Sequence, residues 1–208
     1  MTATNEPRAA STPKSPLEAY RLLAEFWSDA ERLVQSAILD ISSHSFLASL
    51  NARFECGWAA PRYRDMDFIP RVSLDWFTIE VGHGSTRIQL QGAIQVCLSP
   101  SVPCGDYGPA IITLLRLPQN QHELYEWSDD AEAIDLRELQ KPSIAAGAWI
   151  PRGPGYFERR GVYAYVANGG PAEVSRHAGK LIVDPMYVML RRLLIRNFSI
   201  GFKCAPPT

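Results

Sequence analysis

Apolar residues near the start of the chain recur at alternating steps of three and four positions. The repeat consists of Tyr20, Leu23, Trp27, Ala30, Val34, Ala37 and Ile41. This spacing places all seven side chains on one side of an α-helix. Ser15 is suited to cap such a helix, Pro16 fits its first position, and Glu18 can complete a capping box. The pattern therefore predicts an amphipathic helix over residues 16–41.

The apolar stripe of this helix has two interpretations. A strict three-four repeat can be the seam of a coiled coil, and hence an interface with a second copy or a partner. However, Leu22, Phe26 and Leu33 widen the apolar face beyond a narrow seam. Tyr20 and Trp27 are also unusual residues for seam positions. We therefore expect the helix to pack on the protein's own sheet.

The middle of the chain has the residue pattern of a β-hairpin. Residues 76–81 are rich in aromatic and β-branched types, which favour strands. Residues 87–98 alternate apolar side chains with glutamines, which predicts a strand that has one face in solvent. A turn at residues 82–85 connects the two strands. Gly92 interrupts the second strand and indicates a bulge or a close contact there.

The remaining elements follow from apolar runs and from helix-start signals. We expect strands at residues 110–117, 162–167 and 181–183, a loop over 143–157, and helices near 46–54, at 128–141 and after an Asp184 cap. Strands that are grouped together, with helices before and after them, indicate an α+β fold. The sheet is expected to be mostly antiparallel and packed against the N-terminal helix and a C-terminal helix. Residues 1–15 are predicted to be a disordered tail, and 16–208 a single domain.

The composition of the chain excludes few functions, but its charge reduces the kinds of partner that we expect. The chain has 208 residues, of which 46% are hydrophobic and 21% charged, as in ordinary globular proteins. The formal net charge of −1 gives no general reason to expect a nucleic acid or a membrane as partner. No secretory signal and no membrane-length apolar run is present, so we expect a soluble cytoplasmic protein with reduced cysteines. The cysteine spacing suggests neither a metal site nor a cofactor.

A glycine-rich loop at residues 153–161 is the first candidate site. Its glycines allow close approach of a ligand, Tyr156 can stack on a ring, and Arg159 and Arg160 can bind phosphate or carboxylate. This mixture suits a nucleotide, a sugar phosphate or an acidic peptide. The spacing matches no phosphate-loop or dinucleotide motif.

A second candidate is a histidine at the tip of the predicted hairpin. His83 follows Asp75 and Glu80, and an imidazole with two carboxylates is the chemistry of an acid–base pair. Five positions separate the two acids, so a regular strand directs them to opposite faces. No nucleophile motif accompanies this group.

Charged patches provide a third set of candidates. Arg191, Arg192 and Arg196 form a basic stripe on the predicted last helix, and acidic residues are concentrated over residues 123–138. Patches of opposite sign on one chain favour self-association. Trp127 is a candidate interface anchor, because exposed tryptophans contribute strongly to binding. The same arginines, if solvated, would only complement the helix dipole.

These features lead to three functional hypotheses. The first is a non-enzymatic protein-binding or assembly module that recognises a protein partner or a second copy. The second is an enzyme that processes a small molecule or nucleotide between the 82–85 turn and the 153–161 loop. The third is nucleic-acid binding through the C-terminal helix.

Overall fold

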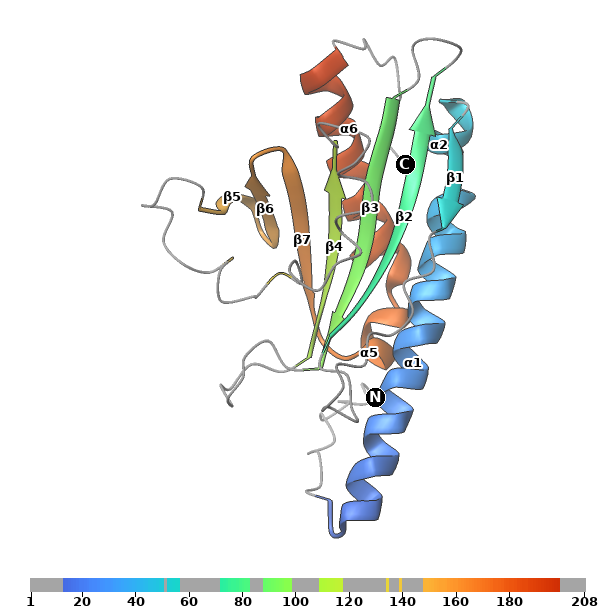
Figure 1. The fold of residues 1–208 in the computed structure, drawn as a ribbon, viewed down its shortest axis with the longest axis vertical. Coiled ribbons are helices and arrows are strands. Elements are labelled where there is room, and N and C mark those ends of the chain that lie inside the picture. Colours follow the sequence, from blue (N-terminus) through green and yellow to red (C-terminus); the bar gives the residue numbers. More distant parts are fainter. Residues whose placement is uncertain are drawn as a thin grey trace, which may run out of the picture.

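Seven antiparallel strands form the central sheet of the computed structural model (Figure 1). The structure describes residues 13–50, 52–56, 72–82, 88–98, 109–117, 134, 139 and 148–198. In sequence order the strands are β1 (Arg53–Cys56), β2 (Val72–Val81), β3 (Ile88–Cys97), β4 (Ala110–Arg116), β5 (Ile150–Gly153), β6 (Tyr156–Arg159) and β7 (Val162–Asn168). Their order across the sheet is β1-β2-β3-β4-β7-β6-β5. With the helices described next, this sheet confirms the predicted α+β class.

Helices cover one face of this sheet. They are α1 (Pro16–Ser42), α2 (Ser45–Ser49), α5 (Pro171–Ser175), the π-helix η2 (Gly179–Val183) and α6 (Asp184–Phe198). The core on this side joins Leu33 and Val34 of α1 and Leu190 of α6 to Phe77 and Ile79 of β2. The long N-terminal helix and the C-terminal helix therefore share a single apolar layer with the sheet.

The apolar stripe of α1 divides into two halves. Ser15 caps the helix as predicted, because its hydroxyl accepts a hydrogen bond from the Glu18 amide. The buried side chains are all in the second half: Ala30, Leu33, Val34, Ala37 and Ile41. The first half contains Tyr20, which is exposed although the pattern predicted it in the core. Figure 1 shows the reason, since α1 runs past the end of the sheet at its N-terminal end.

The second face of the sheet is also covered, so the predicted solvent-exposed face of the hairpin was wrong. Gln91 and Gln95 have no exposed surface. The Gln95 amide both donates to and accepts from the backbone of Ile134, each at 2.8 Å. Arg116 Nε donates to Gln91 Oε1 at 2.9 Å. Buried amides are tolerated when they are hydrogen-bonded, and these partners lie far away in the sequence, where alternation cannot reveal them.

Three local predictions also need correction. Residues 181–183 belong to η2 instead of a strand, and η2 continues into α6, so Asp184 has helical backbone angles and does not cap a separate helix. Residues 150–157 form most of the β5–β6 hairpin instead of a loop. Phe54 lies in β1, where it stacks on Phe77, and not in a helix. In each case tertiary contacts override a weak local preference.

Gly92 confirms the predicted close contact, without a bulge in the β2–β3 register. A Cβ atom at this position would overlap the Phe77 ring. We expect Gly92→Ala to lower the free energy of unfolding by about 1–3 kcal/mol, because a packed core resists added volume. Urea denaturation measures this change. Gly179→Ala is the control, since a Cβ there meets nothing within 4 Å, and an equal loss in both variants would contradict the explanation.

Candidate functional site

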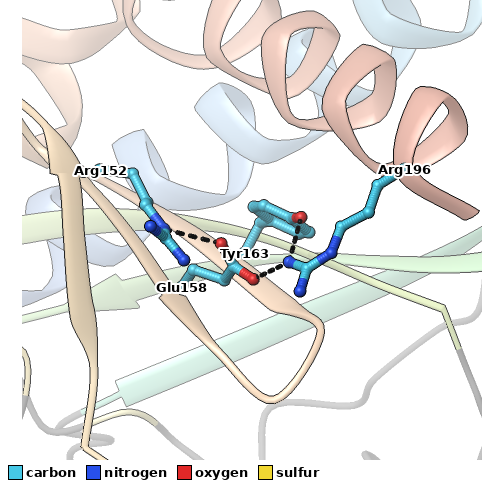
Figure 2. Close-up of polar contacts among 4 residues, drawn as sticks. All are labelled: Arg152, Glu158, Tyr163 and Arg196. Carbon is cyan, nitrogen blue, oxygen red and sulfur yellow. Dashed lines mark hydrogen bonds and ion pairs between the residues drawn. The ribbon is translucent and has the colours of Figure 1, made fainter.

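A buried carboxylate between two arginines forms a polar cluster at one edge of the sheet (Figure 2). The Glu158 side chain is 10% exposed. Arg152 of β5 donates from Nε to Glu158 Oε2 at 2.8 Å. Arg196 of α6 donates from Nη1 to Glu158 Oε1 and, at 3.4 Å, to the Tyr163 hydroxyl. The cluster thus ties α6 to three neighbouring strands.

The alternation of β6 decides which residues join this cluster. Tyr156 and Glu158 point to the face that carries α6, whereas Phe157 packs in the core of the opposite face. Arg192 and Arg196 are one turn apart on α6, and Arg192 lies over the Tyr156 ring while Arg196 pairs with Glu158. The hydrogen bonds with Tyr163 and Glu158 raise the pKa of Arg196 above its ordinary value. The Arg196 guanidinium therefore stays charged near neutral pH.

An aromatic pair continues the cluster along α6. The rings of Tyr156 and Tyr165 are 4.6 Å apart, and Arg192 Cζ lies 5.3 Å from the centre of the Tyr156 ring. Burial and the neighbouring Tyr165 raise the pKa of the Tyr156 phenol, while Arg192 opposes the shift. Tyr156 is therefore neutral near pH 7 and serves as a cation–π partner.

The predicted ligand loop does not converge on one point. Tyr156 joins Arg192, a residue that the sequence suggested for an interface. Arg159 lies over the Trp149 ring at 4.7 Å, on the opposite face of the sheet. Arg160 is exposed and has a φ of 48°, in the tight turn that connects β6 to β7. Tyr156, Arg159 and Arg160 are therefore not placed to bind one ligand together.

The predicted acid–base group is only partly described. His83 lies outside the described residues. Asp75 is on the helix-covered face of β2, and Glu80 has the opposite orientation because five positions separate them. Burial and the charge of Glu31 on α1 raise the pKa of Asp75 to about 6. Asp75 thus faces α1 and not a shared site with Glu80.

The predicted interface residues have different environments. Arg192 and Arg196 are engaged as described above, whereas Arg191 is exposed on α6. Trp127, and all of the predicted 128–141 helix except Ile134 and Leu139, lie outside the described residues. Glu158, Arg152 and Tyr163 were missed as site residues. The alternation of residues 156–159 could have identified Glu158 if this segment had been interpreted as a strand.

The exposed turns of α1 form a second surface. Leu17 and Tyr20 are each 61% exposed, and Leu22 is 48% exposed. Nearby on the same helix, Arg21 and Glu25 are exposed charged residues. No other described helix combines three large exposed apolar side chains within six positions. These residues occupy the part of α1 that extends beyond the sheet (Figure 1).

Two classes of site find no counterpart in the described part of the chain. No group of three or more His, Cys, Asp or Glu side chains there is placed to hold a metal ion. None of the helices described is long and apolar enough to cross a lipid bilayer. Comparisons with protein families, with curated proteins and with solved structures find no match to this chain.

We expect Glu158→Gln to lower the free energy of unfolding by about 2 kcal/mol, because a neutral amide cannot satisfy two charged donors in a buried position. Thermal and urea denaturation measure the loss, and low salt should increase it. Glu173→Gln, an exposed change on α5, is the control. Equal stability of Glu158→Gln and the wild type would show that the cluster does not hold α6 on the sheet.

We expect Asp75→Asn to stabilise the protein at neutral pH. The pKa of Asp75 is about 6 when folded and 3.8 as a free side chain, so the folded state binds the proton more tightly. Stability from this group is complete below about pH 4 and is lost as the pH rises through about 6. The shift sets an upper limit of about 3 kcal/mol, and partial solvent access reduces it to about 1–2 kcal/mol.

Urea denaturation at about pH 4 and pH 7.5 tests this linkage. The gain of Asp75→Asn over the wild type should be present at pH 7.5 and absent at pH 4. Asp40→Asn, an exposed change on α1, should show no such difference. A gain of Asp75→Asn that is the same at both pH values would contradict the expected linkage.

Proposed function

We propose that the protein is a non-enzymatic binding module that docks a protein partner through the N-terminal turns of α1. One observation carries the proposal: Leu17, Tyr20 and Leu22 are exposed on a helix that extends beyond its own sheet. The width of the apolar face in the sequence favoured core packing for the whole stripe. The exposure of Tyr20 in its first half instead supports the interface interpretation for the N-terminal turns.

Leaving the apolar side chains of these N-terminal turns in water is unfavourable, and binding a partner would bury them. At about 100° per residue, Leu17 and Tyr20 lie about 60° apart on one side of the helix, whereas Leu22 lies nearly opposite Tyr20. Exposed apolar clusters of this kind are typical of interaction sites in monomeric proteins. Tyr20 is a suitable anchor, because tyrosine is enriched among residues that dominate binding energy. An amphipathic helix that inserts in an apolar groove is also a common mode of recognition.

The arrangement of the sheet supports binding over the enzyme hypothesis. The β2–β3 turn begins at Gly82, and the predicted ligand loop belongs to β6, four strand positions away. At about 4.8 Å per position, roughly 19 Å separates them. This separation does not favour a single small-molecule site shared by the two segments.

The third hypothesis, nucleic-acid binding, is weakened by the contacts of α6. Arg192 and Arg196 already interact with Tyr156 and Glu158. Of the predicted basic stripe, only Arg191 makes no such contact in the described structure. One arginine on a chain of net charge −1 gives little attraction for a polyanion.

Site-specific photo-crosslinking in cells tests the proposal. A benzophenone amino acid at position 20 should give a covalent protein adduct, because this position lies in the proposed interface. The same probe at Ser36, which is exposed on the same helix beside the core-packed half, should give none. Absence of any protein adduct at position 20 would overturn the proposed binding function.

A further inference from the structure

The spacing of the exposed residues suggests which partner fits them. Leu17, Tyr20, Ala24 and Trp27 follow one another at steps of three, four and three, which is the spacing of a helix-pairing seam. We call these four residues the N-terminal seam. By helix geometry its centre lies about 90° around α1 from the fully buried residues, and its last member, Trp27, is half-buried and also packs against the core of its own chain. Thus α1 can hold its own domain and pair with another helix at the same time.

We propose that a second copy of the chain occupies this surface, with the N-terminal seams of the two α1 helices packed antiparallel. This inference rests on the proposed binding function and names its partner. Antiparallel pairing can place Tyr20 opposite Ala24 of the second copy, and Leu17 opposite its Trp27. Large side chains then meet small ones at the centre, as knobs-into-holes packing requires. Parallel pairing would instead set Tyr20 against Tyr20.

Charges beside the seam favour the same orientation. Arg21 and Glu25 are exposed on one flank of the seam, and neither has an ion pair within the described residues. In an antiparallel pair, Arg21 comes within one helical turn of Glu25 of the second copy. Two-fold symmetry repeats this contact, so two ion pairs form. In a parallel two-fold pair, the flank that carries Arg21 and Glu25 would meet the other flank of the second copy, so these ion pairs would not form.

The position of the sheet permits this arrangement. The fully buried residues of α1 begin at Ala30, beyond the C-terminal end of the seam, and only Phe26 and Trp27 pack against the core before them. In the antiparallel pair, the sheet of the second copy therefore lies beyond the N-terminal end of the first α1. The two sheets therefore lie toward opposite ends of the helix pair.

The short length of the N-terminal seam limits the affinity that we expect for the dimer. Residues 17–27 span about 16 Å, which is short for an interface of the standard size of about 800 Å² per partner. We therefore expect a reversible dimer with a dissociation constant on the order of 10 µM. Such a dimer is concentration-dependent and sensitive to single charges at its flank.

Sedimentation equilibrium of the purified full chain, from about 1 to 200 µM, tests the pairing with charge-swap variants. Arg21→Glu and Glu25→Arg should each weaken the dimer about tenfold, because like charges replace both ion pairs. The double variant should recover wild-type affinity. Arg32→Glu, which changes an exposed charge outside the seam, is the control and should have no effect.

The outcomes separate this inference from the proposed function. A wild-type chain that stays monomeric at 200 µM would overturn the second-copy partner. A double swap that fails to recover affinity would overturn the antiparallel orientation. A crosslink from position 20 to a different protein would overturn the dimer while leaving the binding function in place. A crosslinked mass of two chains supports both.

Discussion

The packing of α1 on the sheet is the interaction on which the rest of the structure depends. From Ala30 to Ile41 its apolar side chains close one face of the sheet, together with α6. The helix has 27 residues, about 40 Å, whereas the longest strands have ten residues, about 34 Å. The buried side chains of α1 begin only at Ala30, and the helix runs past the end of the sheet (Figure 1), so its first turns keep Leu17 and Tyr20 exposed. The fold and the proposed interface therefore arise from the same element.

The opposite edge of the sheet is organised by charge instead of apolar packing. At this edge α6 lies beside β6. The Glu158 carboxylate of β6 accepts hydrogen bonds from Arg152 of β5 and Arg196 of α6. A buried carboxylate is stable only with such partners. At this edge Arg196 pairs with Glu158 and Arg192 lies over the Tyr156 ring, so both arginines have a partner in their own chain. Two arginines of the predicted basic stripe thus help to hold α6 against β6.

Much of the fold was predictable because its signals are local. The cap at Ser15, the strand at β4 and the close contact at Gly92 each depend on neighbouring residues or on a single backbone property. The errors concern positions where distant segments decide. Gln95 is buried because the backbone of Ile134 satisfies its amide. Likewise, Tyr20 is exposed because the sheet ends before the stripe does.

The candidate sites were harder to predict than the fold. Tyr156 and Arg192 were both singled out from the sequence, but as parts of different sites, since nothing local shows that β6 lies beside α6. Glu158 was missed because its segment contains several glycines and prolines and resembled a loop. Its role depends on Arg152 and Arg196, one on each side of it in the fold and 44 positions apart in the chain.

Hydrogen–deuterium exchange of α1 at low and high protein concentration tests the account most directly. Amides of residues 30–41 should be protected at every concentration, because the sheet holds that half of the helix. Amides of residues 17–27 should exchange faster at low concentration and become protected as the concentration rises. Equal protection of both halves at the lowest concentration, or no response of residues 17–27 to concentration, would contradict the account.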